Sequence, residues 1–433
     1  MRWRIGDILA CPECAYSPLR IHDLKTVRKP PGDKSFIHPC EHFCARLNLV
    51  ISESLESREL PCARCREDEI LEALLFCPQC HRWFSTMDGI PHLVRDGLRI
   101  IEAERELLKK YSDTLPLEII EDGIPHSLSG STIASGEQDL KMLDEGVFWG
   151  EFFNAFYERG DRSILDIRVR GTHPMFLNYG VEERHDLEKY KPWGPWPAHL
   201  GSMLFTPLKE TKGKRGLDFG CGGGQFGLEA AYEGVDMTGF DISPAAVGIA
   251  REYAQSIGID SQYVYAEAQN LPFRKQIFSL LMAKDSLHHL DDPKSAIKKV
   301  KPTLIPDALV IIIEHAGNSP FVKFVYDMFA RRLVPRIQRR YPHVDIPSVL
   351  LEGAPNEDMG IKHVERNLKE NFYIVRERRE WLLYLRLEQL VYYAFGKRRR
   401  LTNAFSRIIY IVERLCIKFG APDHIAIIGR HRM

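Results

Sequence analysis

Cysteine is concentrated near the start of the printed sequence. The chain has ten cysteines, and eight of them lie within the first 80 residues as four close pairs. Thiols two or three residues apart suit tetrahedral zinc, because one tight turn then presents two sulfurs to the metal. The sequence therefore predicts two zinc ions, each held by four thiolates. The predicted ligands are Cys11, Cys14, Cys40, Cys44, Cys62, Cys65, Cys77 and Cys80.

The pairing of these four turns is open. The simplest arrangement gives the outer turns, Cys11/Cys14 and Cys77/Cys80, one ion and gives the inserted turns the other. His38, His42 and His81 lie beside the pairs and could each replace a sulfur, although satisfied surface histidines are the commoner case. A cytosolic chain keeps its thiols reduced, so zinc is favoured over disulfides or redox pairs.

A second chemical signal is the glycine-rich stretch RGLDFGCGGGQFGLEAA. It predicts a strand, a turn and a helix, with the backbone passing close to a ligand at the helix N-terminus. Gly222, Gly224 and Gly227 alone would also fit a dinucleotide loop, and a nicotinamide enzyme is the alternative. Asp218 favours a cationic amino group over a pyrophosphate, which its carboxylate would repel. Asp241 ends the next strand about twenty residues on, where an acid accepts both hydroxyls of a ribose.

Residues 216 to about 315 resemble the class I S-adenosylmethionine (SAM) methyltransferases of the ubiquinone/menaquinone-biosynthesis type. The matching motifs are LDFGCGGG, the strand ending in Asp241, AEAQNLPF and SLHHL, in that order. Glu267 departs from the family, in which aspartate is usual at this position. The resemblance implies a SAM site formed by Asp218, Gly220, Gly222, Gly224, Asp241, Ile242, Glu267, Ala268 and Lys284.

Methyl transfer from a sulfonium needs positioning and desolvation, and it needs a base where the acceptor atom carries a proton. His288 and His289 follow the fourth strand, and either is placed to be that base. Asp285 is a further candidate in the same loop. The alternative is that one histidine packs while the other contacts donor or substrate. The loop lacks the motif that binds an amino nitrogen in adenine and glutamine methyltransferases, which argues against those acceptors.

The outer cysteine segments resemble the small zinc-ribbon protein that activates tRNA, rRNA and release-factor methyltransferases. The match is ILACPEC followed far downstream by CPQC and MDGIPHLV, about forty residues in all. The resemblance implies that the ribbon docks on the methyltransferase domain and stabilises it. The alternative is a plain folding module, because metal binding can supply the folding energy of a piece poor in apolar residues.

Strands and helices alternate from residue 216 onward, which predicts an α/β fold. We expect a Rossmann-like class I methyltransferase sheet, mostly parallel, whose last strand is antiparallel. A small zinc-ribbon domain precedes it. The predicted domains are a zinc-ribbon module over 1–96, a helix and linker over 97–137, and the methyltransferase domain over 138–433. Insertions at about 317–355 and 382–420 should rise from the carboxyl edge of the sheet, beside the donor pocket.

Both insertions combine apolar helical stripes with basic clusters. The first carries Phe324 and Met328 near Arg331 and Arg332, and the second carries a basic run at 397–400. Such helices can lie in a membrane interface or grip an anionic lipid-linked substrate. The alternatives are a helical cap packed on the domain, a dimer interface, or a surface for the RNA backbone.

Charge and hydropathy indicate where in the cell the protein is expected to lie. The formal net charge is zero, so no global field indicates nucleic acid. The sequence shows no signal-peptide pattern at its start and no run of about 18 apolar residues. We therefore expect no transmembrane segment and a cytoplasmic protein, with peripheral contact at the inner membrane surface if the basic insertions face lipid.

The functional hypothesis is a SAM-dependent methyltransferase acting on a small metabolite, a glycan or a lipid-linked precursor. One alternative is an RNA methyltransferase that uses its zinc module for recognition. The other is a SAM-binding scaffold without turnover, whose zinc ribbon recruits a partner. Fold alone does not choose among these acceptors.

Overall fold

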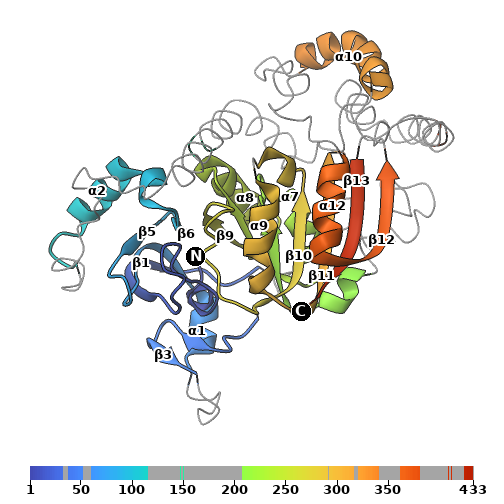
Figure 1. Ribbon diagram of the computed structural model, residues 1–433. Helices are drawn as coiled ribbons and strands as arrows, with labels where there is room; N and C mark the ends of the chain where they lie inside the picture. Colours follow the sequence, from blue (N-terminus) through green and yellow to red (C-terminus); the bar gives the residue numbers. More distant parts are fainter. Residues whose placement is uncertain are drawn as a thin grey trace.

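The computed structural model (Figure 1) describes an N-terminal module and a larger sheet domain. The described residues are 1–32, 38–51, 60–115, 147, 150, 207–290, 292–315, 320–340, 361–380, 408, 411 and 424–432. The predicted linker from 116 to 137 and nearly all of the predicted insertion at 382–420 lie outside them. The same holds for residues 341–360 of the first insertion.

The larger domain is built on a seven-stranded sheet in the order β12-β13-β11-β10-β7-β8-β9. Strands β7 to β11 pair in parallel, and β13 lies antiparallel between β11 and β12. This confirms the predicted fold class. The strands are β7 (Arg215–Phe219), β8 (Asp236–Asp241), β9 (Gln262–Tyr265), β10 (Phe278–Lys284), β11 (Leu304–His315), β12 (Phe372–Glu380) and β13 (His424–His431).

Helices cover both faces of this sheet, because successive strand side chains point to opposite sides. On β10, Leu280 and Met282 pack in the cluster of α7 (Gln225–Tyr232) and α8 (Pro244–Ser256). Leu281 and Ala283 pack in the other cluster, with α9 (Pro293–Val300) and α12 (Ile361–Asn371). Figure 1 shows α9 and α12 side by side on that second face. Because β7 to β11 run parallel, their carboxyl ends lie at one common edge of the sheet.

The N-terminal module has its own four-stranded sheet in the order β1-β4-β5-β6. The β5–β6 turn places Asp88 and Gly89 at positive φ, as a tight hairpin turn requires. Its elements are η1 (Trp3–Asp7), β1 (Arg20–Arg28), β2 (Phe43–Cys44), β3 (Leu49–Val50), α1 (Cys62–Glu67), β4 (Asp68–Phe76), β5 (Trp83–Met87), β6 (Ile90–Pro91), η2 (Asp96–Leu98) and α2 (Ile101–Lys110).

The two regions are joined along the β9 edge of the large sheet (Figure 1). Just after β6, His92 forms a parallel bridge with Tyr265, and the Leu93 N–H donates to the Tyr265 carbonyl at 2.9 Å. Leu9 forms an antiparallel bridge with Phe273. Residues of the N-terminal module such as Trp3 share one buried apolar cluster with the large sheet. The module therefore continues the packing of the sheet domain.

The first predicted insertion contains a long helix, α10 (Pro320–Arg340). The remaining short helices are η6 (Lys209–Thr211), η7 (Leu287–His289) and η8 (Lys301–Thr303). Among the helices in the described part of the chain, none combines the length and the apolar character that crossing a bilayer demands.

Candidate functional site

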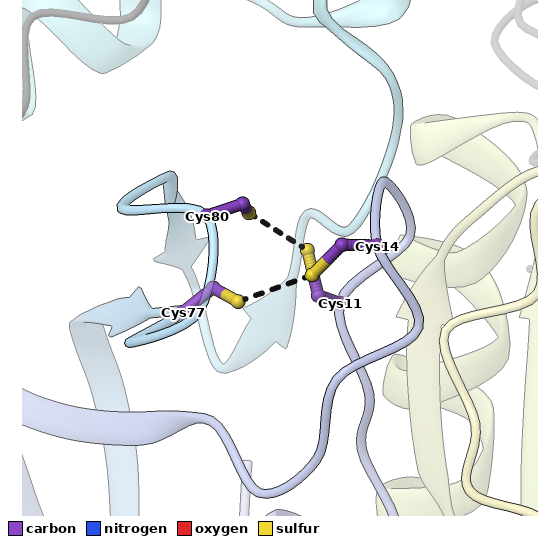
Figure 2. Close-up of side chains that lie close together, drawn as sticks. All are labelled: Cys11, Cys14, Cys77 and Cys80. Carbon is purple, nitrogen blue, oxygen red and sulfur yellow. Dashed lines mark hydrogen bonds between the residues drawn. The ribbon is translucent and has the colours of Figure 1, made fainter.

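Four cysteines of the N-terminal module face one another from two loops (Figure 2). Their sulfur atoms all lie within 4.8 Å of one another. The Sγ atoms of Cys11 and Cys80 are 3.6 Å apart, and those of Cys14 and Cys77 are 3.5 Å apart. Zinc–sulfur bonds of about 2.3 Å in a tetrahedron put the sulfurs roughly 3.8 Å apart. The outer quartet thus has the donor chemistry and the spacing of a structural zinc site.

The two loops of this quartet share one backbone pattern. The N–H of Cys11 donates to the Tyr16 carbonyl, and the N–H of Ala15 donates back to the Cys11 carbonyl. In the same way, Cys77 donates to Arg82, and His81 donates back to Cys77. Ala15 and His81 both have positive φ, which closes each turn tightly. His81 therefore has a backbone role, and the cluster is made of thiols alone.

The four thiols of this cluster differ in acidity. The hydrogen bond with Cys11 lowers the pKa of Cys77 to about 5, whereas the same contact raises the pKa of Cys11 and burial raises that of Cys80 to about 11. The thiolate is the form that binds a metal ion. The four sulfurs lie close enough together to share one zinc ion as thiolates, so the outer quartet can hold one ion.

The prediction of two zinc ions is wrong in number. Among the described residues, Cys40, Cys44, Cys62 and Cys65 do not bring their sulfurs into a second metal-sized group. Cys44 lies in β2, whereas Cys62 and Cys65 lie in α1, and the Cys65 sulfur contacts the Arg46 guanidinium. Burial raises the pKa of Cys40 to about 12 and that of Cys65 to about 11.

The glycine loop leaves the sheet directly after β7. Gly220, Gly222 and Gly224 all have positive φ, the conformation that glycine adopts without strain. A Cβ on Gly220 would lie 2.7 Å from the Ser286 Cβ, and one on Gly224 would lie 2.8 Å from the Ala250 Cβ. The loop therefore packs against the turn after β10 at Gly220 and against α8 (Pro244–Ser256) at Gly224, so a side chain would collide at both positions.

Asp218 lies on β7 beneath the loop, and its Oδ2 accepts the Gly227 N–H at 2.9 Å. Burial raises the pKa of this carboxyl to about 8, and the Gly227 hydrogen bond offsets only part of that effect. Burial disfavours the ionised form of this carboxyl. A cation bound beside it would favour the ionised form and would form a charge pair with it.

Asp241 ends β8, where the sequence placed the ribose acid. Its Oδ2 accepts the Gly222 N–H and its Oδ1 accepts the Ser243 N–H, both at 2.9 Å. Burial raises the pKa of Asp241 to about 6. Ile242, the next residue, packs partly buried against the α7/α8 cluster. One carboxylate therefore ties the glycine loop to the N-terminus of α8 and faces the same edge of the sheet.

Glu267 lies in the loop after β9 and is 2% exposed. Its carboxylate is held by Arg95 of the N-terminal module: the Arg95 Nη2 donates to Oε2 at 2.7 Å, and the Arg95 Nε donates to Oε1. Asn270 Nδ2 also donates to Oε1, at 3.2 Å. Ala268 packs partly buried against the shared core. Arg95 and Asn270 hold the Glu267 carboxylate, and neither was among the residues predicted from the sequence.

The turn after β10 holds the predicted catalytic residues. Lys284 Nζ donates to Asp285 Oδ2 at 2.8 Å, and Asp285 has positive φ. His288 is buried, and its Nδ1 lies 2.8 Å from Glu314 Oε2. The ring of His289 lies beside it, tilted by 47°, with centroids 4.0 Å apart.

Glu314, near the end of β11, organises this whole turn. Its carboxylate accepts the backbone N–H groups of Ser286 at 3.0 Å, Leu287 at 2.8 Å and His288 at 3.4 Å. It is fully buried. The sequence did carry a signal for it, because an acid ending the apolar run LVIIIE stands at the carboxyl edge of a buried strand.

The glycine loop, the two strand-ending acids and the histidine turn meet at the carboxyl edge of one parallel sheet, which is where such sheets bind ligands. The family model of a methyltransferase domain matches residues 217–312, which span all of these features. These residues form a class I SAM-dependent methyltransferase domain.

Relatives of the methyltransferase domain are distant. The ubiquinone biosynthesis O-methyltransferase of Glaesserella parasuis serovar 5 is 27% identical over 220 residues, covering 45% of this chain and 93% of the relative. The enzyme of the same name from Bordetella avium is 26% identical over 190 residues, covering 40% and 79%. A solved structure of Haemonchus contortus phosphoethanolamine N-methyltransferase 2 has 16% identity and a TM-score of 0.35, covering 54% of this chain and 53% of that one.

The residues of the methyltransferase domain fit SAM. The glycine loop turns at positive φ at the carboxyl end of β7, and buried acids lie on β7 and at the end of β8. Ser286 Oγ is buried beside Gly220 and has no hydrogen-bond partner within the described part of the chain. A buried hydroxyl without a partner is costly, so a polar ligand group over the glycine loop would satisfy it.

Proposed function

We propose that this protein transfers the methyl group of SAM to an oxygen of a small or lipid-linked acceptor, with His288 as the base. The observation that carries this proposal is the contact between His288 Nδ1 and the buried Glu314 carboxylate, 2.8 Å long. The turn that bears His288 packs against the glycine loop through Ser286 and Gly220. The similarity to ubiquinone biosynthesis O-methyltransferases supports oxygen as the accepting atom.

On the donor side, we assign the amino acid end of SAM to Asp218 and the glycine loop. Gly220, Gly222 and Gly224 would let the backbone approach it closely, and Lys284 and Ile242 would complete the wall. We assign the ribose hydroxyls to Asp241, and the adenine to Glu267 and Ala268. When bound, SAM supplies a methyl group already activated by its sulfonium, so these residues act by binding and orienting.

On the acceptor side, the Glu314 carboxylate fixes the tautomer of His288. An ionised carboxylate only accepts hydrogen bonds, so Nδ1 carries the ring proton and Nε2 carries the lone pair. Nε2 would take the proton of an acceptor hydroxyl as the oxygen attacks the methyl carbon. Burial of the dyad keeps bulk water away from the reacting oxygen. His289 and Asp285 line the same turn as secondary candidates for this proton transfer.

The lipid-linked acceptor is supported by α10. Phe324 and Met328 are 67% and 45% exposed, and Arg332 and Arg336 continue at the same four-residue spacing. Residues four apart share one face of a helix. An exposed face with apolar side chains at one end and arginines at the other suits an anionic lipid surface. The proposal therefore places the protein in the cytoplasm, in peripheral contact with the inner membrane surface.

The test uses purified zinc-loaded protein, methyl-labelled SAM and a fractionated extract of the source cell. Label in the organic extract, lost in a His288→Gln variant, is the expected result. Label in RNA, removed by ribonuclease, would contradict the small or lipid-linked acceptor and make the zinc module a recognition domain. SAM binding without label in any fraction would contradict turnover and leave a scaffold.

A further inference from the structure

The N-terminal module contributes a side chain to the donor side of the site. Arg95 grips both oxygens of the Glu267 carboxylate from a segment 172 residues away in sequence. The Arg95 side chain is 16% exposed and that of Glu267 is 2% exposed. A planar guanidinium in this two-point geometry fixes the plane of the carboxylate as well as its position.

The hydrogen bonds of Glu267 leave little acceptor capacity. A carboxylate has about four lone-pair positions, two on each oxygen. Arg95 Nε and Asn270 Nδ2 fill those of Oε1, and Arg95 Nη2 takes one on Oε2. One position on Oε2 remains, which suits a single N–H donor such as the amino group of adenine. Arg95 thus selects which carboxylate oxygen can meet a ligand and in which direction.

Arg95 is connected to the cysteine cluster through charged neighbours. Arg82 Nη1 lies 3.0 Å from Glu13 Oε1 and donates to Asp96 Oδ2 at 2.8 Å. Glu13 stands between Cys11 and Cys14, and Arg82 follows Cys80 by two residues. Because Asp96 is adjacent to Arg95, this network reaches from both zinc loops to the residue that grips Glu267.

A backbone connection runs parallel to this network. The Ala10 N–H, one residue before Cys11, donates to the Pro272 carbonyl at 2.8 Å. The Arg274 N–H donates to the Ile8 carbonyl at 2.9 Å. These two bonds tie the first zinc loop to the LPF segment that follows Glu267. Disordering the zinc loops would therefore loosen the Glu267 loop at two points.

We propose that Arg95 is a positioning residue for the donor site and that it makes SAM affinity depend on the zinc-bound order of the N-terminal module. The inference rests on the proposed function, in which Glu267 meets the adenine of SAM. The equilibrium consequence is a coupling between zinc and SAM. Zinc-loaded protein binds SAM more tightly than zinc-free protein, and Arg95 carries most of the difference.

The test is calorimetric titration of SAM and S-adenosylhomocysteine into zinc-loaded wild type, Arg95→Met and a matched control. Arg28→Met is that control, because Arg28 belongs to the same module and pairs with Glu67 at an exposed position, 74% and 44% exposed. We expect Arg95→Met to weaken both ligands about tenfold with zinc content unchanged, and Arg28→Met to bind as wild type. Equal affinity in the two variants would overturn the proposal.

The coupling is tested by repeating the titrations after chelation. Zinc removal should weaken SAM binding by wild type about as much as Arg95→Met does, and should weaken Arg95→Met little further. Equal losses in both proteins would show that Arg95 does not carry the coupling, and would overturn the proposal. Arg95→Lys, which keeps the charge but cannot span both oxygens, should give an intermediate loss and serves if Arg95→Met does not fold. Absence of SAM binding by zinc-loaded wild type would overturn the proposed function itself, a result distinct from the others.

Discussion

In the proposed site, the residues assigned to the methyl donor and those assigned to the acceptor are held by different parts of the chain. On the donor side, Glu267 is gripped by Arg95 of the N-terminal module. On the acceptor side, Glu314 holds His288 and three backbone N–H groups, all within the methyltransferase domain. Both carboxylates are buried. They differ in whether their partners come from the same domain.

This difference separates two kinds of dependence. Changes in the N-terminal module should alter the affinity for the methyl donor, because its contacts reach the Glu267 loop. They should leave the chemistry of the acceptor side intact, because Glu314 takes its partners from its own domain. Changes at His288 should slow the methyl transfer and leave the affinity for the methyl donor unchanged. The predictions below probe this separation from the largest expected effect to the smallest.

Loss of the zinc ion should give the largest effect. Cys77→Ser removes one of four thiolates, and structural zinc contributes apparent binding energies of about 10–16 kcal/mol in zinc-finger peptides. We expect loss of bound zinc, poor soluble yield and a thermal midpoint lowered by roughly 10 °C or more. Zinc is measured by elemental analysis and stability by scanning calorimetry.

The matched control is Cys62→Ser, in the inner quartet, which should keep one zinc ion and near-normal stability. Equal zinc loss in Cys62→Ser and Cys77→Ser would restore the two-ion arrangement and contradict the single site. Unchanged zinc content and soluble yield in Cys77→Ser would contradict the assignment of the outer quartet as a zinc site.

The next effect falls on the acceptor side alone. His288→Gln can still donate an N–H to Glu314 but has no basic ring nitrogen. We expect kcat to fall about 10²- to 10⁴-fold, with the SAM dissociation constant within about twofold of wild type. Steady-state kinetics and calorimetry measure the two quantities. His289→Gln is the control and should lose less activity, and similar losses in both variants would remove the assignment of His288.

How the donor side responds to pH is the third prediction. Burial raises the pKa of Asp218 from 3.8 to about 8, so the empty site keeps this carboxyl protonated below that pH. A cationic ligand favours the ionised form, and the proton must leave on binding. SAM affinity should therefore fall up to about tenfold per unit as pH drops from 8 to 6. Asp218→Asn should bind more weakly and lack this slope, and identical slopes in the two proteins would show that another group is responsible.

The smallest effect concerns α10. Glutamate at the exposed positions Phe324 and Met328 removes apolar surface and adds negative charge, so sedimentation with anionic vesicles should fall several-fold. Donor affinity should stay unchanged, since the helix belongs to the acceptor side of the proposal. Leu47→Glu, at a position 49% exposed in the N-terminal module, is the control and should sediment as wild type. Equal sedimentation of all three proteins would contradict membrane contact through α10.

Local patterns predicted where the glycine loop and the strand-ending acids lie in the fold, whereas their roles toward SAM stay predictions. The glycine loop and the two strand-ending acids depend on residues near one another in sequence, because each strand fixes the turn that follows it. The outer cysteine quartet was also predictable, since each of its loops closes on itself. Arg95 was not predictable, because its partner lies 172 residues away and no spacing rule connects them. The inner cysteines do not form a second metal-sized group among the described residues, because Cys62 and Cys65 lie in α1 while Cys44 lies in β2.

The most direct test of this account is a crystal structure of the zinc-loaded protein with S-adenosylhomocysteine. The account predicts ribose hydroxyls on Asp241, the adenine amino group on Glu267 Oε2 and Arg95 still bound to the same carboxylate. His288 Nε2 should face the side from which the methyl group has left. A nucleoside bound elsewhere, or an Arg95 displaced from Glu267 by the adenine, would contradict it.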